Sequence, residues 1–180
     1  MPDKNTFITE QTLDWLNCFI ITYNICPFAR KPVKQNTLRI AVSNAVKKAS
    51  ALEELMNEIH LLDHNSQIET TLVVFSQAFK DFFTYLGFVD LAERLLSDQG
   101  YDGIYQLASF HPDYYFADTE PDDVTNYTNR SPYPMVHLLR EESLDKAIEA
   151  YGDTKLIPKK NKETLRQSGL AKVKKILNYE

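Results

Sequence analysis

The chain has little glycine, and its five glycines do not build a phosphate-binding loop. They form neither the G-x-G-x-x-G fingerprint of dinucleotide-binding folds nor the G-x-x-x-x-G-K-[ST] pattern of P-loop proteins. The sequence also lacks a C-x-x-C pair, an H-E-x-x-H helix and a G-x-S-x-G nucleophile turn. These absences exclude the nucleotide-binding, zinc-protease and α/β-hydrolase classes that the motifs define.

Cysteine is equally scarce, with only Cys18 and Cys26 in the chain. Cys18 lies within an apolar helical pattern, which argues against the disulfide framework of a small secreted domain. The N-terminus has no basic start followed by an apolar run, and no stretch approaches the ~20 apolar residues of a membrane helix. We therefore expect a soluble protein in a reducing compartment, the cytoplasm, with no membrane partner.

Charge is unevenly distributed around a net value of −5, which disfavours a broad nucleic-acid surface. Basic residues crowd the segment from Lys155 to Lys175, but no aromatic residues are interleaved that would stack on bases. An acidic stretch runs from Asp113 to Asp123. We interpret both as solvated surface and predict no nucleic-acid partner.

Hydrophobic residues make up 43% of the sequence and aromatic residues 12%, which is enough for an ordinary core. No linker or internal repeat divides the chain, so we expect one domain over residues 1–180. Apolar residues at helical spacing predict helices over about 9–24, 52–62, 79–97 and 143–151. Thr9 or Thr12 would cap the first of these helices and Ser143 the fourth.

A last helix is expected after Ile157-Pro158, broken at Ser168-Gly169, while Gly100 and Gly152 would end the third and fourth helices. Strands are expected over 38–42, 70–75 and 104–110. The stretch 135–140 fits a strand or a helix, and we prefer a strand. The resulting order, αβαβαββαα, predicts an α+β fold with a mixed sheet of three or four strands and packed helices.

A long polar segment, residues 111–134, follows the third predicted strand, and such loops in compact domains are usually functional or disordered. It belongs to a distinctive set of sequence segments, S-F-H-P-D-Y-Y-F at 109–116, Y-T-N-R-S-P-Y-P at 127–134 and C-P-F-A at 26–29. In these segments the chain closely resembles a bacterial family known as domain of unknown function 1415. The resemblance covers nearly the whole chain and implies no reaction, cofactor or partner.

Arginine side chains, whose guanidinium groups offer paired donors, and titratable side chains are concentrated between Ser109 and Glu141. Arg130 and Arg140 suit a carboxylate or phosphate, and Asn129 and Ser131 add neutral hydrogen-bonding groups beside Arg130. This clustering favours an enzyme or binding domain for a small anionic metabolite. In a second interpretation, Arg130 only ties the loop down, through carbonyl groups or through acidic side chains.

His111 and His137 are the candidates for proton transfer, although an isolated histidine is commonly a hydrogen-bonded structural residue. Cys26 is a candidate nucleophile, because a short helical turn beginning there would lower its thiol pKa through backbone amides and the nearby cation. Either histidine could serve as its base. The alternative is that Cys26 is simply a small buried apolar residue.

A metal site is a further alternative, in which His111, His137 and Glu141 supply two imidazoles and one carboxylate to a transition metal. A hypothesis of a different class is a non-catalytic interaction or scaffold protein, whose tyrosine-rich loop binds a protein partner. The loop tyrosines would otherwise be packing groups with local hydrogen-bond partners. A concave pocket would favour ligand binding, and a flat exposed patch would favour the scaffold.

Overall fold

Four strands form one mixed sheet in the order β1-β2-β4-β3 in the computed structural model, which describes residues 3–177. The strands are β1 (Leu38–Ser43), β2 (Thr70–Phe75), β3 (Tyr105–Phe110) and β4 (Met135–Arg140). β1 runs parallel to β2, and β4 is antiparallel to both of its neighbours. The predicted α+β class is confirmed, and the ambiguous stretch 135–140 is a strand.

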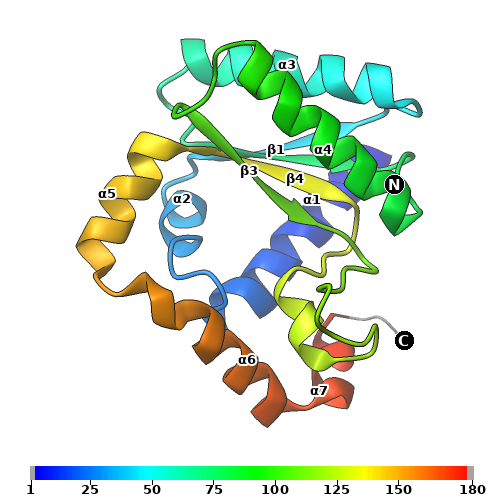
Figure 1. Cartoon of the computed structure of the whole chain (residues 1–180), viewed down its shortest axis with the longest axis vertical. Coiled ribbons are helices and arrows are strands. Elements are labelled where there is room, and N and C mark those ends of the chain that lie inside the picture. The colour runs from blue at the N-terminus through cyan, green and yellow to red at the C-terminus, as the bar shows by residue number, and fades with distance from the viewer. Residues whose placement is uncertain (1–2, 178–180) are drawn as a thin grey trace.

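Helices cover both faces of this sheet (Figure 1). One face is covered by α3 (Lys48–His64) and α4 (Phe82–Asp98). The other face is covered by α1 (Lys4–Trp15), the π-helical η1 (Leu16–Ile21), the 3₁₀ helix η2 (Val124–Thr128), α6 (Ile157–Ser168) and α7 (Leu170–Ile176). The remaining elements are α2 (Arg30–Lys34), α5 (Glu141–Tyr151) and the 3₁₀ helix η3 (Thr154–Leu156). Within residues 3–177, no helix is both long and apolar enough to cross a bilayer.

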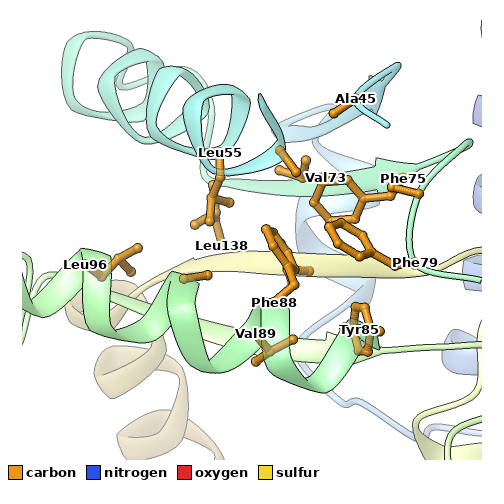
Figure 2. Packing of buried hydrophobic residues seen from close by; sticks show 14 of the residues in the cluster. Ala45, Leu55, Val73, Phe75, Phe79, Tyr85, Phe88, Val89, Leu96 and Leu138 are labelled. Carbon is orange, nitrogen blue, oxygen red and sulfur yellow. The ribbon is translucent and has the colours of Figure 1, made fainter. Parts of the chain in front are cut away.

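Aromatic rings dominate the core between the sheet and the α3 and α4 pair (Figure 2). Phe79 stacks on Phe88 with ring centroids 4.3 Å apart, and Phe75 meets both rings edge-on at 5.0 Å. Tyr85, fully buried, donates its hydroxyl proton to the carbonyl oxygen of Met135 and accepts the N–H of Phe110. These hydrogen bonds fix α4 against the ends of β3 and β4.

Strand alternation decides which β4 side chains face which core. Val136 and Leu138 pack with α3 and α4, whereas Met135 packs with α1, α6 and α7. Because successive strand residues point to opposite faces, His137 shares the side of Met135. The imidazole of His137 is thereby directed away from the aromatic core.

The first helix differs from its predicted position. It begins at Lys4, where the Asp3 side chain accepts the N–H of Asn5 as a cap. The hydroxyls of Thr9 and Thr12 donate instead to carbonyls four residues earlier within the helix, so neither threonine caps it. After Trp15 the chain widens into η1, whose π-type turns were not predicted.

Two other helix starts also differ. α5 begins at Glu141, directly after β4, so the prediction that Ser143 caps this helix is wrong. α4 begins at Phe82 with Asp81 as its cap, because Phe79 adopts a left-handed conformation (φ 62°) that no helix continues through. The predicted break between α6 and α7 is confirmed at Gly169 (φ 78°).

Candidate functional site

A cavity of about 430 Å³ lies on the sheet face that carries His137. Its floor is formed by side chains of three strands, namely Leu72, Phe110 and His137. Trp15 and the η1 residues Leu16 and Ile20 form a second wall. The remaining lining comes from the segment around Cys26, from Phe116 in the loop after β3, from the end of η2 and from the first turns of α6. The cavity is therefore assembled from segments that are distant in the sequence.

The protonation state of the His137 ring follows from its partner, Thr70. The Thr70 hydroxyl oxygen lies 2.5 Å from the carbonyl oxygen of Leu138 and 2.7 Å from Nε2 of His137. Two oxygens at this separation need a hydrogen between them, so Thr70 donates its only proton to Leu138. Thr70 must then accept from His137, which places the imidazole proton on Nε2 and leaves a lone pair on Nδ1.

Burial keeps His137 uncharged. Loss of solvent around the ring lowers its pKa to about 4, because the imidazolium form would have to be desolvated. No carboxylate partner compensates this cost among the described residues. His137 is therefore a neutral hydrogen-bonding group at neutral pH, and a weak base.

Cys26 lines the same cavity and is partly buried. Burial raises the pKa of its thiol, and hydrogen bonds from the backbone N–H groups of Phe28 and Ala29 to the sulfur offset this only in part. Its pKa is therefore above that of an ordinary cysteine, and at neutral pH the group is a thiol rather than a thiolate.

Two amide side chains also belong to the polar lining, and their hydrogen-bond partners assign the orientation of each. Asn129 donates its amide nitrogen to the carbonyl of Ser109, and its Oδ1 accepts the hydroxyl of Thr128. Asn161 on α6 donates its amide nitrogen to the carbonyl of Ile25 at 2.7 Å. Since a carbonyl can only accept, the amide nitrogen faces the carbonyl in both residues, and the amide oxygen and the second N–H hydrogen are left for other partners.

Lys162 brings a cation to the cavity lining, at an edge next to Phe116. Its ammonium nitrogen lies 5.8 Å from the centre of the Phe116 ring, a cation–π geometry. Most of the other lining residues are apolar, with the Trp15 indole nitrogen turned to the carbonyl of Arg130 at 3.1 Å. The cavity combines apolar walls with a few fixed polar groups.

His111 lies elsewhere, on the α4 side of the sheet. It is fully buried between the rings of Phe82 and Tyr85. Its Nδ1 accepts the N–H of Asp113 at 3.0 Å, so its Nε2 carries the proton and donates to the carbonyl of Phe79 at 2.8 Å. Burial lowers its pKa, as it does for His137. Both nitrogens of His111 are used within the fold, and the sheet separates it from His137.

Arg130 is engaged by the loop that carries it. Its guanidinium donates to the carbonyls of Tyr114 at 3.0 Å and Pro121 at 2.5 Å, and it lies over the Tyr127 ring at 4.6 Å. Carbonyl contacts of this kind agree with the second interpretation of the sequence, in which Arg130 only holds the loop in place. Ser131, which is fully buried, donates to the carbonyl of Tyr133 at 2.6 Å and is not part of the cavity lining.

Arg140 lies at the far end of β4 and donates hydrogen bonds to acceptors in another part of the chain. It donates to the carbonyls of Leu62 and Ile68 and to the hydroxyl of Tyr105. These contacts join the end of α3 to the loop before β2. Arg130 and Arg140 therefore bind separate parts of the chain and do not converge on one anion.

Arg140→Leu is expected to lower the free energy of unfolding by about 2 to 3 kcal/mol, because the partly buried carbonyls of Leu62 and Ile68 lose charge-assisted donors. The measurement is urea denaturation followed by circular dichroism. Arg39→Leu is the matched control: Arg39 is paired with Glu58 at the surface, and its loss should cost under about 1 kcal/mol. Equal losses in the two variants would contradict a structural role for Arg140.

The residues of the metal alternative do not come together. Within residues 3–177, no three His, Cys, Asp or Glu side chains form a group able to hold a metal ion, and this includes His111, His137 and Glu141. Glu141 begins α5, with its backbone N–H bonded to the carbonyl of Ile104.

The loop tyrosines pack inward to different degrees. Tyr127 is buried at 2% exposure, and Tyr114 and Tyr115 pack against the Phe82 ring. Asn126, fully buried, ties the loop together: its Oδ1 accepts from Phe116 and Thr119, and its amide nitrogen donates to Glu120.

Of the residues singled out from sequence, the cavity brings together Cys26, His137 and Asn129. Sequence reasoning missed Asn161 and Lys162, which were counted only as part of a basic tail or not at all. The one available signal was their position on the helix after Ile157-Pro158. The hydrophobic periodicity of the sequence does not indicate that this helix contacts the Cys26 region. Sequence reasoning also missed Thr70, which appeared only as a strand residue.

Fold and cavity define a small α+β protein with a lined cavity between its sheet and the helices of one face. The chain belongs to the family described as protein of unknown function DUF1415, whose model matches residues 7–175. No curated protein and no solved structure matches the chain. The family assignment agrees with the resemblance found in the sequence and adds no activity to it.

Proposed function

We propose that this protein is a binding domain for a small, largely apolar molecule that carries a polar group, held in the cavity between Cys26 and His137. The observation that carries the proposal is the lining itself. Apolar side chains from strands and η1 surround polar groups of fixed orientation contributed by Asn129, Asn161 and His137. A volume of about 430 Å³ lies within the range of small-molecule sites.

Binding is favoured over proton transfer or thiol catalysis by the state of the polar groups. A histidine with a pKa of about 4 is a poor base at neutral pH, and a thiol whose pKa is raised is a poor nucleophile. An anionic metabolite held by Arg130 and Arg140 is not part of the proposal, since the guanidinium donors of both residues face carbonyl groups.

The test is a panel of naphthalene derivatives followed by NMR on labelled protein: 2-naphthol, 2-methoxynaphthalene and 2-naphthoate. At least one should bind and shift the amide signals of cavity residues. Ala29→Trp, which places an indole in the cavity, should weaken that binding about tenfold or more. Ala150→Trp, at an exposed position of α5, is the matched control and should leave it unchanged. If no member binds, or if both variants bind equally well, the proposal is wrong.

We also propose that the protein works in the bacterial cytoplasm. The support is that both cysteines are free thiols, Cys18 exposed and Cys26 partly buried, as expected in a reducing compartment.

A further inference from the structure

Three polar groups of the cavity, on His137, Asn161 and Asn129, each present an atom that can accept a hydrogen bond. At His137, the free atom is Nδ1, because Nε2 carries the ring proton and donates it to Thr70. At Asn161, which is 9% exposed, it is Oδ1, and the amide nitrogen donates one of its two hydrogens to the carbonyl of Ile25. At Asn129 it is again the amide oxygen, which accepts only from Thr128.

These orientations follow from the number of protons that each group can donate. Each depends on a carbonyl oxygen as the fixed partner, and a carbonyl oxygen has no proton to give. Rotating either amide by 180° would place two acceptors against each other, and moving the imidazole proton to Nδ1 would leave Thr70 with two acceptors and one proton. With a neutral imidazole, this is the arrangement that satisfies the contacts to the carbonyls of Leu138, Ser109 and Ile25.

The donors that the lining offers to a ligand belong to residues other than His137. They include the second N–H of each asparagine amide, the thiol of Cys26, which is a weak donor, and Lys162, which lies at the edge of the cavity against the Phe116 ring. The guanidinium groups of Arg130 and Arg140 are not part of the lining. An anionic group placed against Nδ1 of His137 would meet a lone pair and would lose hydration there without gaining a donor from the imidazole.

We propose that the ligand is an uncharged molecule with an apolar body and a hydrogen-bond donor, such as a phenol, an alcohol or an N–H heterocycle. The donor is accepted by Nδ1 of His137, with the amide oxygen of Asn161 as a further acceptor. This proposal rests on the proposed function, because it names the chemistry of the ligand for the same cavity. In this proposal, His137 and Asn161 are binding residues that accept hydrogen bonds from the donor group of the ligand.

The three naphthalenes separate the alternatives, because they share one ring system. 2-Naphthol offers a donor, 2-methoxynaphthalene removes it and 2-naphthoate replaces it with an anion. For the unmodified protein at pH 7, we expect the dissociation constant of 2-naphthol to be about tenfold lower than those of the other two, the effect of one buried hydrogen bond. Isothermal titration calorimetry gives the three constants.

His137→Phe should remove the preference, weakening 2-naphthol about tenfold while changing 2-methoxynaphthalene by less than about threefold. If this variant does not fold, the three constants of the unmodified protein still decide the question. Tighter or equal binding of 2-naphthoate or 2-methoxynaphthalene overturns the donor assignment but leaves the cavity as a binding site. Absence of binding by all three overturns the proposed function as well.

Discussion

Replacing Asn126 with alanine is expected to lower the free energy of unfolding by about 3 kcal/mol. The side chain is fully buried and bonds to three chain positions in the loop, accepting from the N–H of Phe116 and the hydroxyl of Thr119 and donating to the carbonyl of Glu120. Alanine would leave the partly buried N–H of Phe116 without a partner, and would remove an acceptor from the Thr119 hydroxyl and a donor from the Glu120 carbonyl, although that carbonyl keeps the N–H of Asp123. A lost hydrogen bond of this kind costs about 1 to 3 kcal/mol. Urea denaturation followed by tyrosine and tryptophan fluorescence measures the change.

The control for this experiment is Asn44→Ala. Asn44 is exposed, and its amide oxygen accepts only from the side chain of Gln77 at 3.4 Å. Its removal should change the free energy of unfolding by less than about 0.5 kcal/mol. If Asn126→Ala were as mild as the control, the loop would not depend on this asparagine for its structure.

Acid should destabilise the protein through His137. Its pKa is about 4 in the folded protein and about 6.5 in an unfolded chain, so below pH 6.5 the unfolded state binds the proton more readily. The stability that the neutral ring contributes is complete above pH 6.5 and is lost as the pH falls toward 4. From this shift the loss attributable to His137 amounts to about 3 kcal/mol at pH 4.

Comparison with His137→Phe isolates this effect from the titration of carboxyl groups. The free energy of unfolding is measured by urea denaturation at several values between pH 7 and pH 4 for both proteins. The variant should lose less stability over this interval, by about the amount given above. Parallel pH profiles for the two proteins would mean that His137 has an ordinary pKa in the folded state. Such a result would also remove one argument for a neutral ring in the cavity.

The sheet could be predicted from sequence because its signals are local. The β-branched, apolar run from Thr70 to Phe75 matches β2 to the residue, as expected for a strand buried on both faces. Helix starts were predicted less well, since each depends on one capping contact. Thr9 offered the right chemistry, but its hydroxyl found a carbonyl within the helix, and Asp3 took the capping position.

The candidate site could be predicted only in part, because its members are selected by sheet geometry. His111 and His137 look equivalent in the sequence, yet they lie on opposite faces of the sheet, and this follows from register rather than from composition. The same holds for the arginines, whose fork-shaped donors suit backbone carbonyls as well as anions. Which partner they meet depends on loops that have no periodic pattern.

The pairing of β2 with β4 has a consequence for the order of folding. Strands β1 and β2 of the β1-α3-β2 unit pair closer positions, such as Leu38 with Thr70, whereas the bond between Thr70 and His137 joins positions 67 residues apart. Closing the longer loop carries the larger entropic cost, so we expect the β2–β4 joint to form after the β1-α3-β2 unit. The cavity has its floor on both strands and cannot exist before that joint closes. We therefore expect the ligand to bind only to chains whose sheet is fully formed, and partly folded chains should not compete for it.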